Sequence, residues 1–178
     1  LKHAGVECVL VEADRICGGV TEITTGELTV QHGLSYNKLI SRFGQEKARL
    51  YLKAQAEACA EYARLCEGID CNYEKQDSFV YSLSSCKELE KELVALSRLG
   101  LNASLCAPSA LPFDAAGAIC VKGQAQFHPL KFAFEIAKGL TIYEKTKVLE
   151  LMPNKAVTNR GEIRCKKIIV ATHFPILN

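Results

Sequence analysis

The stretch VECVLVEADRICGG, from Val6 to Gly19, decides how the rest of this chain is interpreted. It begins with an apolar run rich in valine, Val6–Val11, which is typical of a buried parallel strand covered on both faces. One acid, Glu12, follows the run directly, and a Gly-Gly pair comes soon after it. An acid at the carboxyl end of a parallel strand lies where open α/β sheets bind their ligands. We therefore take Glu12 as the residue around which a site is built.

In dinucleotide-binding folds such an acid accepts hydrogen bonds from ribose hydroxyls, and a G-x-G-x-x-G loop precedes it by about 20 residues. Only eleven residues precede Glu12, and Leu1–Gly5 has the form of the last turn of a helix that ends at a glycine. The sequence therefore predicts a fragment, in which the first strand, the phosphate-binding loop and most of the first helix lie upstream of Leu1.

The composition is that of a globular domain, and it argues against nucleic acid and a membrane as partners. The chain has 178 residues, 48% of them apolar, and a formal net charge of +2. Because the basic residues are scattered, we expect no nucleic-acid surface. Since no apolar run approaches the roughly 18 residues of a membrane span, we expect no membrane span.

Nine cysteines are many for a chain of this length. Their number is odd and no C-x-x-C pair occurs, which argues against a disulfide framework or a zinc ribbon and predicts no metal site. We interpret them as reduced thiols that act as small apolar side chains, with a redox or iron–sulfur role as the alternative. A reducing cytoplasm is the compartment that this interpretation favours.

The segment 15–33 is rich in glycine and threonine and too long for a simple connector. Glycines let backbone N–H groups approach an anion closely, and threonines add hydroxyl donors. The pyrophosphate, the ribityl chain and the ring of a flavin would all be served by such a segment. The alternative is a mobile surface loop.

Hydrophobic periodicity and the turn residues predict the remaining elements. Helices are expected over residues 35–43, 45–67, 86–99 and 129–138. Strands are expected over residues 72–75, 78–82, 118–127, 140–144, 147–151, 155–158, 162–165 and 168–172. Pro108 and Pro112 indicate an irregular segment or an edge strand. The run 168–172 is again of the buried parallel kind, so the middle of the chain is predicted to be inserted into a nucleotide-binding sheet.

Three polar side chains alternate on one side of the predicted strand 118–127 and just beyond it: Gln124, Gln126 and His128. A polar face of this kind can line a substrate cavity. It can equally be the solvent-facing side of an antiparallel sheet. The alternation alone leaves both interpretations open.

Taken together, VLVEADRICGG, TTGELTVQHGLSY, QAQFHPLKFAFEIAKG, IYEKTKV and VTNRGEIRCKKIIVATHFP resemble the FAD-dependent oxidoreductases of the D-amino-acid oxidase and glycine oxidase type. The resemblance covers nearly the whole chain, and the order and spacing of the motifs carry it. It is strongest toward members whose catalytic domain is often followed by a Rieske-type iron–sulfur domain.

This resemblance implies an α/β fold, with part of a Rossmann-like parallel FAD-binding sheet and an inserted α+β portion of the substrate domain. The FAD-binding portion would cover residues 1–44, without its first strand and Gly-rich loop. The substrate or cap portion would cover residues 45–125, and residues 126–178 would return to the FAD-binding portion.

The resemblance also implies roles for single residues. Glu12 would hold the adenosine ribose, with Asp14 and Arg15 beside it near the adenine. Gly18, Gly19 and Thr21 would approach the pyrophosphate and the ribityl chain, while Thr24, Thr25, Gly26 and Leu28 would border the flavin ring. Val148 would meet the adenine through its backbone, and Ala171 and Thr172 would pass under the adenosine and pyrophosphate. Gln124, Gln126 and His128 would belong to the substrate region.

The implied reaction is oxidation of a small-molecule amine or amino acid by hydride transfer to flavin N5, in the cytoplasm. No base is required, and His32 and His128 are the weak candidates for one, with Tyr36 a further possibility. The fragment alone is expected to bind FAD weakly or not at all, to be inactive and to self-associate through open sheet edges. Two alternatives stay open: a nicotinamide-binding module, which the long Thr/Gly loop disfavours, and a catalytically inactive truncated remnant or interaction module.

Overall fold

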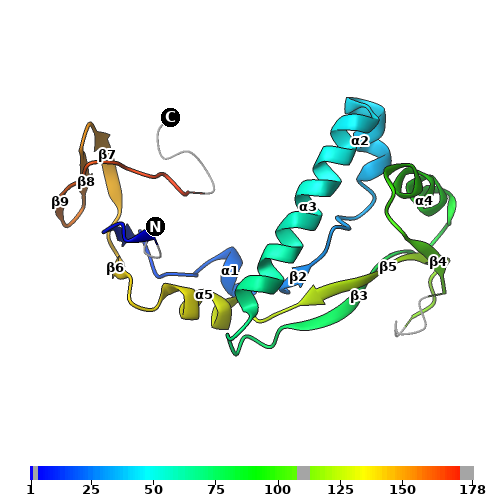
Figure 1. The fold of residues 1–178 in the computed structure, drawn as a ribbon, viewed down its shortest axis with the longest axis horizontal. Coiled ribbons are helices and arrows are strands. Elements are labelled where there is room, and N and C mark those ends of the chain that lie inside the picture. Colours follow the sequence, from blue (N-terminus) through cyan, green and yellow to red (C-terminus); the bar gives the residue numbers. More distant parts are fainter. Residues whose placement is uncertain (2–3, 108–112, 173–178) are drawn as a thin grey trace. The chain divides into compact units, whose positions relative to one another are not determined.

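A computed structural model describes residues 1, 4–107 and 113–172 of the chain (Figure 1). Its contacts divide the chain into two compact units, one of residues 1–23 with 136–178 and one of residues 24–135. Pro108 and Pro112 lie outside the described residues. The domain boundaries predicted from the sequence, after residues 44 and 125, stay a prediction.

The first unit contains the parallel pair that the sequence predicts around Glu12. Strand β1 (Val9–Val11) pairs in parallel with β6 (Thr141–Tyr143), with Val9 opposite Thr141 and Val11 opposite Tyr143. The strand is shorter than the predicted run 6–11, and Val9 and Leu10 are exposed, so the prediction that it is buried on both faces is wrong for the described residues. The predicted α/β class with a parallel sheet is confirmed.

A separate three-stranded antiparallel sheet follows in the same unit. It consists of β7 (Val148–Met152), β8 (Lys155–Thr158) and β9 (Gly161–Arg164) in that order. The predicted hairpin is confirmed, because β8 and β9 pair about a turn at residues 159–160. The Thr158 hydroxyl closes this turn by donating to the Gly161 carbonyl at 2.7 Å.

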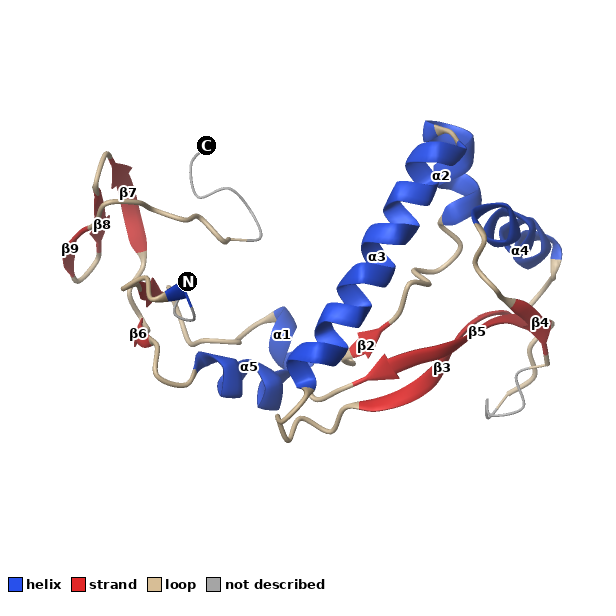
Figure 2. Ribbon diagram, viewed as in Figure 1, coloured by secondary structure: helices blue, strands red, loops and turns tan. Residues whose placement is uncertain are grey.

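The prediction of a second buried strand over residues 168–172 is wrong. The described residues after β9 form a loop (Figure 2), and Ile169 is 68% exposed. An apolar run forms a strand only where a neighbouring strand pairs with its backbone. None of the strands within the described ranges pairs with this run.

The second unit is built on one antiparallel sheet whose central strand is β5 (Gly117–Gln126). Strand β3 (Glu74–Ser82) pairs along β5, while β2 (Glu27–Leu28) and β4 (Ser104–Cys106) also pair with it. Two strands were expected over 72–82, but the structure has one strand with a β-bulge at Asp77, whose carboxylate accepts the Gly123 N–H at 3.0 Å.

Four of the helices match the predicted ones closely: α2 (Tyr36–Phe43), α3 (Gln45–Cys66), α4 (Lys87–Leu99) and α5 (Pro129–Ala137). Gly44, with φ 82°, ends α2, and Gly100, with φ 85°, ends α4. A short helix, α1 (Val20–Ile23), lies within the predicted long loop. None of the helices in the described part of the chain is long and apolar enough to cross a membrane.

The start of α4 has the S-x-x-E pattern of a capping box, Ser85–Glu88, which predicts reciprocal bonds between these two side chains and the backbone. The Ser85 hydroxyl accepts the Lys87 N–H at 3.2 Å, as expected of a residue that begins a helix. The Glu88 carboxylate does not reach back to complete the box, because it pairs with Lys91 at 2.6 Å.

Helix α3 differs from the prediction in what it packs against. The spacing of its residues predicts one face that packs on a sheet, formed by Tyr51, Ala54, Ala58, Cys59, Tyr62 and Leu65. The main helix contacts of α3 are instead with α2 and α4, and Tyr51, Tyr62 and Leu65 are exposed. Ala48, Leu52 and Cys66 are the buried positions. The buried positions thus carry two small side chains and one leucine, and no aromatic ring.

The main core of the second unit lies where α2, α3 and α4 meet the sheet, and α4 contacts β4 and β5 directly (Figure 1). Its buried members are Val30, Tyr36, Ala48, Leu52, Leu89, Ala95, Leu96, Leu99, Ile119 and Val121. A smaller cluster joins Cys66, Cys71 and Phe132. Val30 and Tyr36 belong to this core, so it holds the segment 29–36 in place. The predicted site residues 24–28 lie directly before this segment.

Candidate functional site

Glu12 lies at the carboxyl end of a parallel strand, as predicted. Its N–H donates to the Tyr143 carbonyl at 2.9 Å and so continues the β1–β6 ladder by one residue. Its own carbonyl accepts the Thr146 N–H at 2.9 Å. The backbone of Glu12 is therefore held on both sides by the segment that leaves β6.

The Glu12 side chain is half-buried and keeps part of its hydrogen-bonding capacity. One carboxylate oxygen accepts the Asp14 N–H at 2.9 Å. The other has no hydrogen-bond partner among the residues that the structure describes. A carboxylate has about four acceptor positions, so this one can accept further donors such as a pair of hydroxyl groups.

Asp14 and Arg15, which follow, are both paired. The Asp14 carboxylate pairs with the Lys145 ammonium, and the Asp14 carbonyl accepts the Lys145 N–H at 2.8 Å. The hydrogen bond and charge of Lys145 hold the pKa of Asp14 below its ordinary value. Arg15 lies 4.0 Å from Glu22 in an exposed ion pair.

The glycines after Arg15 allow a sharp turn. The Gly18 N–H donates to the Arg15 carbonyl at 3.2 Å, and a Cβ on Gly18 would lie 3.2 Å from that same oxygen. Gly19 has φ 75°, a conformation that L side chains rarely adopt. Thr21 lies within α1 and is exposed. A loop that turns this tightly presents its backbone rather than bulky side chains.

Cys17 lies in the same turn, and the pKa of its thiol is affected by Glu12. Burial raises the pKa of its thiol, and the nearby negative charge of Glu12 raises it further. Cys17 also has a positive φ of 61°. The Glu12 carboxylate, which accepts the Asp14 N–H, is thus close enough to this turn for its charge to act on the Cys17 thiol.

The remaining predicted residues of the first unit lie on its antiparallel sheet and in the loop after β9. Val148 begins β7, opposite Thr158 of β8, and is half-buried. Ala171 and Thr172 are exposed in the loop. The roles of these three residues toward the adenosine half stay predictions.

In the second unit, the segment predicted to border the flavin ring lies beside the strand predicted to face the substrate. Glu27 and Leu28 of β2 pair with Gln126 and Ala125 of β5. The Gly26 carbonyl accepts the Phe127 N–H at 3.1 Å. Thr24 and Thr25 precede this contact and are exposed. The structure therefore brings two of the predicted groups together.

Gly26 is the closest point of this contact. A Cβ at this position would lie 2.2 Å from the Phe127 carbonyl oxygen and 3.0 Å from Cδ of Pro129, and φ is 74°. No side chain fits there without displacing backbone. Glycine is required for β2 to lie against the end of β5.

The three polar residues of β5 and its extension already have partners within the chain. The Gln124 amide accepts the Val30 N–H at 2.9 Å and donates to the Lys122 carbonyl at 3.0 Å. Gln126 donates to Glu74, and His128 Nδ1 accepts the Lys131 N–H at 3.5 Å. Gln124 thus holds the segment after β2 in place, and a substrate role for the three stays a prediction.

The candidate bases do not gather around one point. His32 Nε2 lies 3.2 Å from Gln55 Oε1, and neither His32 nor His128 hydrogen-bonds to another predicted site residue in the described part of the chain. Tyr36 is fully buried, and its hydroxyl donates to the Val30 carbonyl at 2.6 Å. Burial raises the pKa of Tyr36 above its ordinary value.

Glu144, Lys145 and Thr146 were missed by sequence reasoning, although they make the contacts that hold residues 12–16. A signal for them exists in the sequence. Glu144 comes directly after β6, as Glu12 comes directly after β1, and both therefore lie at the carboxyl end of a parallel strand.

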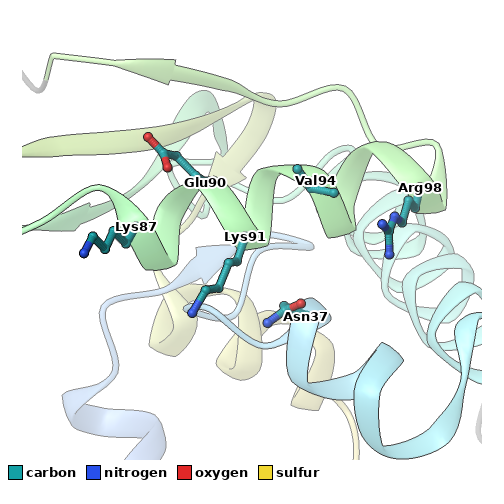
Figure 3. A pocket seen from close by; sticks show the side chains of 6 residues that line it. All are labelled: Asn37, Lys87, Glu90, Lys91, Val94 and Arg98. Atoms are coloured by element: carbon teal, nitrogen blue, oxygen red, sulfur yellow. The ribbon is translucent and has the colours of Figure 1, made fainter.

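An open depression of about 460 Å³ lies elsewhere, between α2 and α4 (Figure 3). Its lining residues are Asn37, Lys87, Glu90, Lys91, Val94 and Arg98, and none of them is a predicted site residue. All nine cysteines are free thiols, and within residues 1, 4–107 and 113–172 no three His, Cys, Asp or Glu side chains are placed to hold a metal ion.

Comparison with known proteins decides the family. The family profile described as FAD dependent oxidoreductase (DAO) matches residues 1–175. The chain belongs to the DAO family. The resemblance found in the sequence motifs is therefore confirmed.

A curated protein is similar to nearly the whole chain. It is 31% identical over 188 aligned positions to the Rieske 2Fe-2S iron-sulfur protein YhfW of Bacillus subtilis (strain 168), covering 98% of this chain and 37% of the relative. That name agrees with the predicted likeness to members that carry a Rieske-type domain. The chain thus spans well under half the length of this curated relative.

Solved structures show the same fold at low sequence identity. Glycine oxidase from Geobacillus kaustophilus superimposes with a TM-score of 0.68 at 19% identity, covering 92% of this chain and 48% of that one. L-amino acid deaminase from Proteus vulgaris gives a TM-score of 0.60 at 18% identity, covering 95% and 42%. The DAO chain described here therefore has the fold of the corresponding part of these enzymes.

Proposed function

We propose that this chain forms part of an FAD-dependent oxidoreductase that oxidises an amine or amino acid. Membership of the DAO family supports the cofactor, and the fold shared with an amino-acid oxidase and a deaminase supports the substrate class. When bound, FAD would supply the acceptor of the substrate hydride, at flavin N5. The cytoplasm is the proposed compartment, because free thiols in this number suit a reducing environment.

The residues present fit the adenosine half of this cofactor. Glu12 has a carboxylate oxygen without a partner among the described residues, at the strand end where α/β sheets bind ligands. It would accept the hydroxyls of the adenosine ribose. Gly18 and Gly19 would let the backbone approach the pyrophosphate, with Asp14, Arg15 and Thr21 alongside.

Other residues would serve the ring and the adenine. Thr24, Thr25, Gly26 and Leu28 would border the flavin ring, and the tight Gly26–Phe127 contact supports their role by fixing this segment against β5. The Val148 backbone would meet the adenine, with Ala171 and Thr172 nearby. Gln124, Gln126 and His128 would belong to the substrate region, and a neutral amine held over the ring needs no protein base.

The position of Glu12 carries the proposal, and a binding measurement tests it. Glu12→Ala removes the acceptor for the ribose hydroxyls, and a hydrogen bond to a charged group contributes about 1.5–3 kcal/mol. FAD titrated into the purified chain and followed by flavin fluorescence should bind the variant at least about tenfold more weakly than the wild type.

Glu7→Ala is the matched control, because Glu7 is an exposed acid that precedes β1, whereas Glu12 follows it. It should leave FAD affinity unchanged. Equal affinity of the wild type and Glu12→Ala would contradict the ribose role. Equal affinity for NAD and FAD in the wild type would favour the nicotinamide-binding alternative.

A further inference from the structure

Glu144 reaches across the first unit to the loop that follows Glu12. Its carboxylate accepts the Ile16 N–H at 2.8 Å, over a separation of 128 residues in the sequence. We propose that Glu144 is a positioning residue for the cofactor: it fixes the loop 12–16 and thereby directs the Glu12 carboxylate. This inference rests on the proposed function, since it concerns the same adenosine-binding loop.

The bond to Ile16 is the last step of a regular series. The Thr146 N–H donates to the Glu12 carbonyl at 2.9 Å, and the Lys145 N–H donates to the Asp14 carbonyl at 2.8 Å. Residues 12, 14 and 16 are thus bound in turn by residues 146, 145 and 144. At the third position the direction reverses: the Ile16 N–H donates and the Glu144 side-chain carboxylate accepts it, so the identity of residue 144 matters there.

The segment that holds the loop is itself held from the other side. The Asn159 side chain accepts the Lys147 N–H at 2.8 Å and donates to the Lys145 carbonyl at 3.3 Å. The Asn159 N–H adds a bond of 3.0 Å to the Lys147 carbonyl. The turn between β8 and β9 therefore supports residues 145–147, which in turn support the cofactor loop, as outer partners orient the groups that bind a ligand.

The loop needs such support because its own conformation is demanding. Cys17 has φ 61° and Gly19 has φ 75°, so the backbone turns sharply just after Ile16. Without the Glu144 bond, the Ile16 N–H would lose a charge-assisted partner, and the residues between Glu12 and the turn would sample more conformations. Ordering them again on binding would reduce FAD affinity.

The test compares Glu144→Ala with Glu144→Gln by FAD titration of the purified chain, together with amide hydrogen exchange at Ile16 without FAD. Glu144→Ala should weaken FAD binding by about fivefold to tenfold and speed exchange at Ile16. Glu144→Gln keeps an acceptor oxygen and should restore most of both. Glu150→Ala removes an exposed acid of β7 and should change neither.

The outcomes separate the two proposals. Wild-type FAD affinity in Glu144→Ala, or unchanged exchange at Ile16, would overturn the positioning role. FAD affinity unchanged in Glu12→Ala, together with faster Ile16 exchange in Glu144→Ala, would overturn the ribose role of Glu12 in the proposed function while it supports the hold of Glu144 on the loop. Equal losses in the alanine and glutamine variants would point to charge alone and also overturn the role.

Discussion

The carboxylate of Glu92, in α4, accepts the backbone N–H of Tyr36, the first residue of α2, at 2.7 Å. It also accepts the Asn37 N–H at 2.8 Å. Glu92 is only 1% exposed, and its charge lies at the positive end of the α2 dipole. A residue 55 and 56 positions away thus caps α2, where the neighbouring Ser35 side chain forms no cap.

Glu92→Ala should therefore destabilise the chain by about 2–4 kcal/mol, because two N–H groups would lose their acceptor in the core. Guanidinium unfolding followed by circular dichroism measures this loss. Glu90→Ala, an exposed acid of the same helix, should change stability by less than about 0.5 kcal/mol. Similar values for the two variants would refute the capping role of Glu92.

Gly26→Ala should be far more damaging than Gly33→Ala. Both glycines have positive φ, 74° and 61°, but a Cβ at Gly26 would collide with the Phe127 carbonyl, whereas a Cβ at Gly33 meets nothing within 4 Å. We expect a loss of about 1 kcal/mol at Gly33 from the backbone conformation alone. The loss at Gly26 should be at least about 3 kcal/mol, since β2 must move away from β5. Thermal unfolding of both variants measures the two losses of stability. Equal losses would show that the backbone around Gly26 can shift to accommodate a Cβ at little cost.

Lys145→Met should raise the pKa of Asp14 back toward its ordinary value of 3.8, because the Lys145 hydrogen bond and charge are what lower it. The lowered pKa means that the pair stabilises the folded chain above pH 3.8 and that this contribution is lost as the pH falls through the lower folded pKa. The wild type and Lys145→Met should thus converge in stability at acid pH. Carboxyl NMR titration follows Asp14 directly.

Lys155→Met serves as the control for that titration. The Lys155 ammonium lowers the pKa of Glu162 in a separate exposed pair of the same unit. Its removal should shift the resonance of Glu162 and leave Asp14 unaffected. A shift of Asp14 in this variant would mean that the two pairs are linked through the whole sheet.

Tyr36→Phe should cost about 1 kcal/mol, because it removes one buried hydrogen bond, to the Val30 carbonyl, and keeps the ring in the core. Tyr51→Phe, at a ring 5.9 Å away that is partly exposed, should be nearly neutral. Urea unfolding distinguishes the two. A neutral Tyr36→Phe would argue that the hydroxyl is not needed to hold the segment after β2.

Local signals in the sequence located most elements well. Gly44 and Gly100 end helices because glycine adopts a positive φ without strain, and Pro129 begins α5 where its missing N–H costs nothing. The position of Glu12 after a parallel strand also followed from local pattern. These features depend on a few neighbouring residues, so one sequence is enough to predict them.

Features that depend on distant partners could not be predicted in the same way. The buried positions of α3 are Ala48, Leu52 and Cys66 rather than its tyrosines; Ala48 and Leu52 belong to the main core, and Cys66 belongs to the cluster with Cys71 and Phe132. Glu92 and Glu144 act on backbone groups 56 and 128 residues away, which no periodicity reveals. The apolar run 168–172 has strand composition, but only a paired neighbour makes a strand.

The pair formed by β1 and β6 affects how the purified chain should be handled. Within the described residues, β1 and β6 pair only with each other, so the backbone N–H and C=O groups on the far edge of each strand have no partner strand. The apolar side chains of Val9 and Leu10 and the ring of Tyr143 are exposed on these strands. Open strand edges of this kind pair with strands of other molecules, and such association increases with protein concentration. Dilute, cool preparations with mild detergent should stay clear for longer, and light scattering during concentration would be the first warning of precipitation.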